Sequence, residues 1–286
     1  MKEIVILSGK GGTGKTSIVG SFASIVPNKV MADCDVDAAD LYLLLNPSVR
    51  EKNEFRSGQV AVIDNDKCTK CDLCMDICRF DAIHDYNINH IPCEGCGFCS
   101  HICPVEAITM EECKAGDWFV SDTKYGPLVH ARLGIAQENS GKLVALVSRQ
   151  ARELVEKNGL DYVISDGPPG IGCPVISCLS GVDLALIVTE PTLSGMHDLE
   201  RVIGVCRHFS VLPLVCINKY DLNEENTHQI EKYCLELGIE VASRIRFDNV
   251  FTEAMVRGLP VVEYAQNGVA RQIETLWQYI EKKLHK

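Results

Sequence analysis

The sequence predicts an α/β protein with a mostly parallel sheet flanked by helices, into which a small α+β domain is inserted. Apolar runs of strand length alternate with segments of helical periodicity, and this alternation is typical of parallel strands joined by crossover helices. From about residue 58 to residue 113 the pattern stops, and closely spaced cysteines and short loops replace it. We therefore expect one α/β domain built from residues 1–57 and 114–286, with a separate insert at 58–113.

The predicted elements of the α/β domain follow in chain order. The β-branched run at 3–8 predicts a strand, a glycine cluster follows it, and the periodicity of 16–26 predicts a helix. Further strands are predicted at 29–32, 162–165, 184–189 and 212–217, and further helices at 38–45, 141–158, 196–208, 224–237 and 270–284. Residues 118–120 are a candidate strand and 126–127 a candidate turn, although periodicity alone does not decide this segment.

Charge and hydropathy exclude several classes of protein. The 286 residues carry a formal net charge of -11 without a cluster of Lys and Arg, so we expect no nucleic-acid partner. No run approaches the roughly 18 consecutive apolar residues of a membrane span, and the N-terminus lacks an export signal. Mixed charges in the C-terminal segment favour a helix packed on the core over a membrane-surface helix. The sequence therefore predicts a cytoplasmic protein without stable membrane association.

A glycine-rich loop between the first strand and the first helix fits the pattern G-x-x-x-x-G-K-[ST]. Its glycines allow main-chain N–H groups to close around phosphate oxygens, and the N-terminus of the following helix adds positive potential. Lys15 is expected to reach the β and γ phosphates, and the Thr16 hydroxyl to bind Mg²⁺. The alternative is a glycine-rich turn without function. The predicted nucleotide-binding residues of this loop are Gly9, Lys10, Gly11, Gly12, Thr13, Gly14, Lys15, Thr16 and Ser17.

A second lysine, Lys10, directly after the first glycine, makes this loop resemble the deviant Walker A loop of the MinD, ParA, Mrp and nitrogenase iron-protein ATPases. The resemblance implies a P-loop NTPase fold, Mg-dependent ATP hydrolysis and a dimer that sandwiches ATP, with an identical or a related chain as partner. It also implies a catalytic role for Lys10 beside Lys15. In that family the extra lysine reaches into the partner's nucleotide site and offsets transition-state charge. On the motif alone, Lys10 could instead be a solvated loop residue.

Two further segments resemble the switch regions of this family. Asp33 and Asp35 follow the second strand, and the resemblance implies that Asp33 supports Mg²⁺ through water while Asp35 orients the attacking water. The string D-G-P-P-G beginning at Asp166 resembles switch II, with Asp166 in the Walker B role. Carboxylates at the C-terminal ends of parallel strands face the ligand crevice, which suits a magnesium-phosphate site. Each segment alone could also be an acidic turn that caps a helix.

Asn218 opens an N-K-x-D string at the end of a predicted strand, where it could contact the base of a nucleotide. In many GTPases this string reads guanine. In ATPases of the MinD and Mrp type a similar asparagine contacts adenine, and the resemblance therefore favours ATP.

The insert holds two runs of cysteines with the spacing C-x2-C-x2-C-x3-C, which is typical of bacterial two-cluster ferredoxins. The runs start 25 residues apart, at Cys68 and Cys93, and similar strings, D-A-I and E-A-I, follow both. In such a module the first three cysteines of a run wrap one [4Fe-4S] cluster and the fourth ligates the other. Structural zinc is the alternative, because C-x2-C pairs also bind zinc. One cluster is expected on Cys68, Cys71, Cys74 and Cys103, and the other on Cys93, Cys96, Cys99 and Cys78.

Two residues of special interest remain. Arg79 stands where the second run has Pro104, and we expect its positive charge to raise the potential of the nearby cluster. Cys173 lies seven residues after Asp166, and resemblance to the nitrogenase iron protein makes a cluster bridging two subunits an alternative there, with Cys178 nearby. A buried core cysteine is the favoured interpretation of Cys173. The other single cysteines receive no role: Cys34, Cys113, Cys206, Cys216 and Cys234.

Three functional hypotheses follow. The first is an ATP-dependent iron-sulfur protein, in which nucleotide binding and hydrolysis drive metallocluster assembly, cluster insertion or electron transfer to an acceptor metalloprotein. The second is a ferredoxin-type electron carrier that uses ATP or ADP only as a conformational ligand. The third is a spatial-positioning ATPase of the MinD type, which would need a basic amphipathic C-terminal helix; Glu274 and Glu281 dilute the lysines there.

Overall fold

The computed structural model describes residues 1–134, 139–266 and 268–285 and divides the chain into two compact units. The first unit comprises Met1–Lys52, Trp118–Arg132 and Ser140–Lys286, and the second Asn53–Asp117 and Leu133–Asn139. The long strands β3 (Ser48–Ile63) and β6 (Ile108–Thr123) each begin in one unit and continue into the other. The expected domain boundaries at 58 and 113 fall within these two strands, because the cysteine-rich composition begins after the chain has left the first unit.

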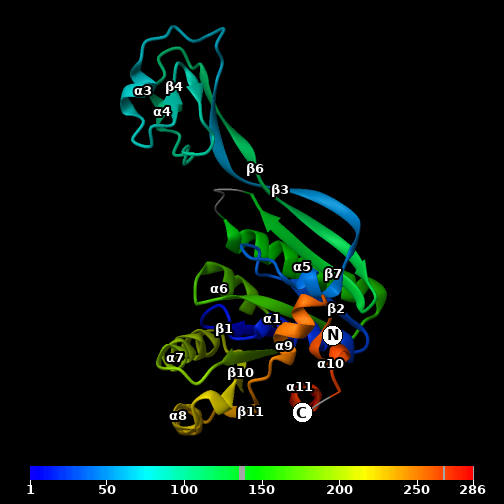
Figure 1. Cartoon of the computed structure of the whole chain (residues 1–286). Helices are drawn as coiled ribbons and strands as arrows, with labels where there is room; N and C mark the ends of the chain where they lie inside the picture. Colours follow the sequence, from blue (N-terminus) through cyan, green and yellow to red (C-terminus); the bar gives the residue numbers. More distant parts are fainter. Residues whose placement is uncertain (135–138, 267, 286) are drawn as a thin grey trace. The chain divides into compact units, whose positions relative to one another are not determined.

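Within the described residues, one sheet orders its strands β11-β10-β9-β1-β8-β2-β7-β6-β3 (Figure 1). Every neighbouring pair from β11 to β7 in this order is parallel. Only two residues connect β6 to β7, a length that joins antiparallel neighbours. The sheet is therefore mostly parallel, as predicted. Its remaining strands are β1 (Lys2–Ser8), β2 (Lys29–Asp33), β7 (Gly126–Leu133), β8 (Tyr162–Pro169), β9 (Leu184–Thr189), β10 (Leu212–Asn218) and β11 (Glu240–Ile245).

Helices connect these strands, as the α/β pattern requires. Their bounds are α1 (Lys15–Ile25), α2 (Leu41–Leu45), α5 (Ser140–Asn158), α6 (Cys173–Leu179), α7 (Leu193–His208), α8 (Glu224–Glu236), α9 (Val250–Val256), α10 (Val261–Tyr264) and α11 (Gly268–Leu284), with a 3-10 turn, η1, at Tyr220–Leu222. None of the helices in the described part of the chain has both the length and the apolarity that crossing a bilayer requires.

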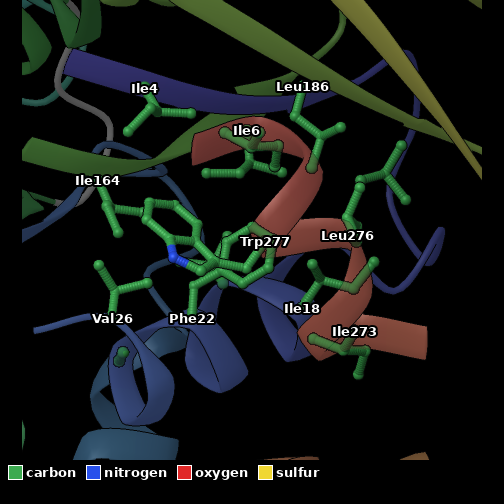
Figure 2. Packing of buried hydrophobic residues seen from close by; sticks show 14 of the residues in the cluster. Ile4, Ile6, Ile18, Phe22, Val26, Ile164, Leu186, Ile273, Leu276 and Trp277 are labelled. Atoms are coloured by element: carbon green, nitrogen blue, oxygen red, sulfur yellow. The ribbon is translucent and has the colours of Figure 1, made fainter. Parts of the chain in front are cut away.

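The C-terminal helix α11 packs on the core of the first unit (Figure 2). Trp277 meets the rings of Phe22 and Tyr162 edge to face, with centroids 5.4 and 5.5 Å apart. Ile273 and Leu276, on the same helical face, are fully buried. Because this apolar face is covered by the protein's own core, the helix predicted at 270–284 is a structural element of the sheet domain.

The second unit contains two segments with similar backbone conformation. It contains α3 (Leu73–Ile77), α4 (Phe98–Ile102) and a small antiparallel pair, β4 (Ile83–His84) with β5 (Asn87–Ile88). The two helices start 25 residues apart, the same offset that separates the cysteine runs. Left-handed backbone angles recur at this offset, with φ of 57° and 63° at Lys70 and Gly95, 67° and 73° at Asp72 and Gly97, and 51° and 50° at Asp81 and Glu106. The duplication in the sequence is thus a duplication of local structure.

Most predicted elements are confirmed to within a few residues, and two need correction. The helix expected at 38–45 begins only at Leu41, because the main-chain N–H of Leu41 donates to the Asp33 carboxylate at 3.2 Å and a turn fills the preceding residues. The turn expected at 126–127 lies just before Gly126, which begins β7; the Thr123 hydroxyl donates to the Gly126 carbonyl at 2.7 Å and closes that turn.

Candidate functional site

The glycine-rich loop lies between β1 and α1 and borders a cavity of about 360 Å³. Loop residues 11–17 line it, together with Asp35 from the loop after β2 and Met255 from α9. Gly14 has a φ of 88°, and a Cβ at this position would lie 2.4 Å from the side-chain nitrogen of Asn218. Gly9 does not line the cavity, but a Cβ on it would meet Asp198 at 2.2 Å. Glycine is therefore required at both positions, by backbone conformation or by close packing.

Lys15 lies at the centre of the buried charges beside this cavity. Its ammonium is paired with the Asp166 carboxylate and lies 4.0 Å from Asp35 Oδ2. Burial alone would lower the pKa of Lys15, but the carboxylates of Asp166, Asp35 and Asp33 outweigh burial and hold that pKa above its ordinary value. Lys15 is thus positively charged at the loop, and the predicted residues of both switch segments lie close to it.

The two switch I carboxylates experience different environments. Asp33, the last residue of β2, is fully buried, and burial together with the nearby Asp166 raises its pKa well above the ordinary value. Burial also raises the pKa of Asp35 to about 6, although Lys15 opposes the shift. The raised pKa values show that burial and mutual repulsion disfavour ionisation of these carboxyl groups; a divalent cation bound with phosphate would favour their ionised forms.

The hydroxyl groups of the loop fit a phosphate ligand. Thr13 is 2% exposed, and its Oγ1 has no hydrogen-bond partner among the described residues. A buried hydroxyl without a partner is costly unless a ligand satisfies it. Thr16 and Ser17 line the same cavity at the start of α1. The loop therefore offers hydroxyl donors in addition to its main chain.

Asn218 holds the glycine-rich loop in place through a hydrogen bond to the main chain of the loop. It ends β10, is 1% exposed, and donates from its side-chain amide to the Thr13 carbonyl at 2.7 Å. The neighbouring Asp221 accepts the main-chain N–H of Phe247 at 2.6 Å. One carboxylate oxygen of the N-K-x-D string is therefore engaged by the protein itself. Contact between Asn218 and a base stays a prediction.

Lys10 does not line the loop cavity and is bound by other residues of its own chain. Its ammonium lies 2.6 Å from Glu190 Oε1 and donates to the hydroxyls of Ser194 and Thr192 at 3.0 and 3.3 Å. Glu190 was not predicted from the sequence, and Lys219 was noted only as part of the N-K-x-D string; Lys219 pairs with the other Glu190 oxygen at 3.1 Å. The one available signal was the position of Glu190 directly after a buried strand, at the sheet edge where ligands bind.

The eight cysteines of the second unit surround two separate cavities. Each cavity takes three cysteines from one run and the fourth from the other run: Cys93, Cys96, Cys99 and Cys78 border a cavity of about 260 Å³, and Cys68, Cys71, Cys74 and Cys103 border one of about 20 Å³. This grouping has the crossed pattern that the spacing predicts. In the described part of the chain, no three His, Cys, Asp or Glu side chains are set to hold a single metal ion.

Main-chain donors reach the fourth sulfur of each run in the same way. The N–H of Ala82 donates to Cys78 Sγ at 3.4 Å, and the N–H of Ala107 to Cys103 Sγ at 3.3 Å. Such bonds stabilise thiolates and tune metal centres. Burial raises the pKa of the thiols of Cys74 and Cys99, and neighbouring cysteines add to both shifts. Any metal bound through these thiols would displace their protons.

The structure separates Cys173 from Cys178. Cys173 is the first residue of α6 and is exposed, so the interpretation of it as a buried core residue is wrong. Cys178 is buried, and burial together with a hydrogen bond to Cys34 raises its pKa well above the ordinary value. Cys206, Cys216 and Cys234 are buried, as expected for small apolar side chains, and Cys113 is half-buried in the second unit.

The first strand of a parallel sheet runs into a glycine-rich loop and a helix, and carboxylates end the strands beside it. This arrangement defines a P-loop nucleotide-binding protein. The chain belongs to the family described as the CobQ/CobB/MinD/ParA nucleotide binding domain, which matches residues 4–261.

Several characterized and uncharacterized proteins are similar to this chain in sequence. The chain is 40% identical to the uncharacterized protein MJ0578 of Methanocaldococcus jannaschii over 228 residues, 78% of this chain and 80% of that protein. It is 24% identical to a cytosolic Fe-S cluster assembly factor, the NUBP1 homolog of Brugia malayi, over 98% of this chain and 81% of that protein. A segment of 68 residues, 23% of the chain, is 43% identical to 84% of the pyruvate synthase subunit PorD of Methanothermobacter marburgensis.

Among solved structures, the septum site-determining protein MinD of Pyrococcus horikoshii, complexed with Mg-ADP, has a similar fold. The TM-score is 0.59 at 19% identity, with 99% of this chain and 96% of that chain covered. The likeness extends to the α/β fold with its mostly parallel sheet.

Proposed function

We propose that this protein is an ATP-dependent, dimeric iron-sulfur protein that couples nucleotide binding and hydrolysis to the assembly or insertion of a metallocluster, or to electron transfer, in an acceptor metalloprotein. One observation carries the proposal: a phosphate-binding loop with a buried lysine and three carboxylates occurs in the same chain as two cavities that are each bordered by four thiols. Nucleotide chemistry and cluster chemistry are thereby available to one polypeptide.

In the nucleotide half, bound Mg²⁺ would supply charge neutralisation at the phosphates. Lys15, now paired with Asp166, would contact the β and γ phosphates. The Thr16 hydroxyl and the Asp166 carboxylate would hold Mg²⁺, with Asp33 supporting it through water. Asp35, the most accessible of the three carboxylates, orients the attacking water. ATP is favoured over GTP because Asp221, which would have to bind the guanine edge, accepts a main-chain N–H of its own chain.

In the cluster half, the crossed sets of four cysteines would hold two [4Fe-4S] clusters, which supply one-electron chemistry when bound. The donor set fits these groups, since thiolates are the ligands of iron-sulfur clusters and main-chain N–H groups already point at Cys78 and Cys103. Cys71 and Cys96, one from each run, are exposed and would bring both clusters close to the protein surface.

The proposed partners follow from both halves. ATP and ADP occupy the loop cavity, a second copy or a related chain completes the ATP-bound dimer, and a metalloprotein accepts a cluster or electrons. The relative described as a cytosolic Fe-S cluster assembly factor supports the proposal that a metalloprotein is the acceptor. We propose a cytoplasmic protein without nucleic acid or membrane partners. The buried apolar face of α11 argues against the membrane-positioning alternative.

The test is anaerobic purification followed by iron and sulfide analysis and ATPase measurement on the wild type, Lys15→Ala and Cys74→Ala. We expect about eight irons in the wild type, because two [4Fe-4S] clusters hold that number. Lys15→Ala should abolish hydrolysis and keep the iron, and Cys74→Ala should lose iron. Loss of hydrolysis in Cys74→Ala as well would show that the two halves are coupled. Zinc in place of iron, or failure of the wild type to bind ATP, would refute the proposal.

The second candidate function is an electron carrier that uses nucleotide only as a conformational ligand. The exposure of Cys71 and Cys96 favours it, because electron transfer needs clusters near the surface. This candidate predicts no multiple-turnover ATP hydrolysis by the reduced, iron-loaded wild type. Turnover under those conditions would exclude it.

A further inference from the structure

Glu190 forms ion pairs with two lysines, Lys10 in the phosphate-binding loop and Lys219 after β10. It follows β9 directly, and its side chain is only 16% exposed. One carboxylate oxygen lies 2.6 Å from the Lys10 ammonium, and the other 3.1 Å from the Lys219 ammonium. Lys219 also donates to the Gly12 carbonyl at 2.9 Å. One carboxylate therefore holds the loop at Lys10 directly and at Gly12 through Lys219.

The contacts of Lys10 use its full hydrogen-bonding capacity. A lysine ammonium has three N–H donors, and Lys10 finds three acceptors in Glu190, Ser194 and Thr192. These acceptors are themselves fixed, because Thr192 caps the N-terminus of α7 by accepting the Gly195 N–H at 2.9 Å. Burial would raise the pKa of Glu190, but hydrogen bonds from Lys10 and Lys219 outweigh it and keep that pKa below its ordinary value. The group is thus a set of satisfied, charge-assisted hydrogen bonds.

A lysine bound in this way cannot at the same time reach a nucleotide in another subunit. We propose that Glu190 is a positioning residue that holds Lys10 on its own chain in the nucleotide-free protein, so that Lys10 must leave Glu190 before an ATP-bound dimer can form. The inference rests on the proposed ATP-dependent dimer. Breaking the contact between Lys10 and Glu190 adds a free-energy cost to dimer formation. This cost keeps the monomer predominant until nucleotide is bound.

The main test measures dimer formation by sedimentation velocity with Mg²⁺ and a non-hydrolysable ATP analogue. We expect Glu190→Gln to lower the dimer dissociation constant about threefold to tenfold, because the uncharged amide holds the ammonium less strongly. Glu190→Asp, which keeps the charge on a shorter side chain, should fall between Glu190→Gln and the wild type. Combined with Lys10→Ala, Glu190→Gln should produce no further change. An unchanged or weaker dimer in Glu190→Gln overturns the proposal.

Glu263→Gln is the matched control. Glu263 is also a partly exposed glutamate paired with a lysine, Lys124, at 2.6 Å, and its neutralisation changes the net charge equally. This variant should dimerise like the wild type. An equal gain in both variants would mean that net charge alone promotes association, and the role of Glu190 would be refuted.

A second measurement is independent of the dimer. Trace acetylation of the nucleotide-free protein, read residue by residue with mass spectrometry, reports the accessibility of each lysine amine. Lys10 should react severalfold faster in Glu190→Gln than in the wild type, with Lys157 as the internal reference. Equal rates overturn the proposal. If the wild type forms no dimer with the analogue, the proposed dimeric function fails, and the acetylation rates still decide whether Glu190 holds Lys10.

Discussion

At the scale of single residues, the raised pKa of Asp35 gives a prediction on the pH dependence of the proposed ATP hydrolysis. Burial raises the pKa of Asp35 to about 6, and only the ionised carboxylate can orient an attacking water. The active form is therefore present above pH 6 and is lost as the pH falls below it. We expect kcat/KM for ATP to fall about tenfold for each pH unit below 6, since this parameter reports the free enzyme. Asp35→Asn should have low activity without this acidic limb.

The raised pKa of Asp35 also affects the stability of the fold, and its effect on stability is opposite to its effect on activity. Because the pKa of Asp35 is higher in the folded chain than its ordinary 3.8, the folded state binds this proton more strongly than the unfolded state. The contribution of Asp35 to the free energy of unfolding is therefore most favourable below about pH 4 and declines as the pH rises to about 6. Ionisation of Asp35 as the pH rises from 4 to 6 should therefore increase activity and decrease the free energy of unfolding. In Asp35→Asn, the free energy of unfolding measured against pH should lack this decrease.

Arg79 gives a prediction on the potential of one cluster. It borders the cavity of Cys78, Cys93, Cys96 and Cys99, and a positive charge there would stabilise the reduced form of the proposed cluster, which carries one more negative charge. We expect Arg79→Gln to lower the midpoint potential of one cluster in an anaerobic redox titration and to leave the other nearly unchanged. Lys67→Gln, which removes a lysine paired with Asp64, is the control. Equal shifts in both clusters would contradict the prediction.

Local spacing in the sequence predicted where the residues of the glycine-rich loop and the switch segments lie, but it gave no sign of contacts between residues far apart in the chain. The loop 9–17, Asp33, Asp35 and Asp166 follow from strand-loop-helix patterns, because strand ends of a parallel sheet meet at one edge. The contacts of Glu190 with Lys10 and of Lys219 with Gly12 could not be predicted, since about 180 and 207 residues separate the two members of each pair. Contacts at such separation leave no periodic signal.

At the scale of elements, the crossed cysteine sets make a distinctive prediction. Cys78→Ser should destroy the cluster bordered by Cys93, Cys96 and Cys99, although Cys78 belongs to the first run. The iron content should fall from about eight to about four per chain, and paramagnetic resonance of the reduced protein should show a single cluster type. Cys113→Ser is the control, because Cys113 lies in the same unit and borders neither cavity. Retention of full iron by Cys78→Ser would exclude crossed ligation.

The helix α11 gives a stability prediction for the first unit. Trp277 is 5% exposed and packs on the rings of Phe22 and Tyr162. Replacement by alanine leaves a cavity, so Trp277→Ala should reduce the free energy of unfolding by about 3–5 kcal/mol. Leu235→Ala, on the exposed side of α8, should change it by less than about 0.5 kcal/mol. Anaerobic urea denaturation measures both, and a similar loss in the two variants would contradict the assignment of α11 to the core.

The elements that escaped prediction share a physical cause. β3 and β6 are 16 residues long and mostly polar or charged where they are exposed, so β3 was not predicted and only the candidate strand 118–120 of β6 was. The short helices α6, α9 and α10 have too few turns to show a period. The central strands and the longer helices α1, α5, α7, α8 and α11 were predicted because burial imposes a strong pattern on them.

At the scale of the whole molecule, hydrogen-bonded strands link the proposed nucleotide site to β6, the strand that continues into the cysteine-bearing unit. Asp33 ends β2, which pairs with β7 at His130, and Ser121 of β6 is hydrogen-bonded to His130 at 2.9 Å. β6 then continues into the unit that carries the cysteines. A change at Asp33 on nucleotide binding can therefore displace a strand shared by both units. We expect ATP binding to change the cluster potential, and cluster reduction to change the affinity for ATP.

Thermodynamic linkage makes this expectation quantitative, because the two effects must be equal in free energy. For a one-electron cluster, each tenfold change in ATP affinity between the oxidised and the reduced protein corresponds to a shift of about 59 mV in midpoint potential. The affinity is measured by equilibrium dialysis with a non-hydrolysable analogue in both redox states, and the potential by titration with and without that analogue. Lys15→Ala, which should not bind nucleotide, must show no shift. Unchanged affinity together with unchanged potential would mean that the shared strand does not couple the two sites; unequal free energies would mean that more than one redox centre responds to the nucleotide.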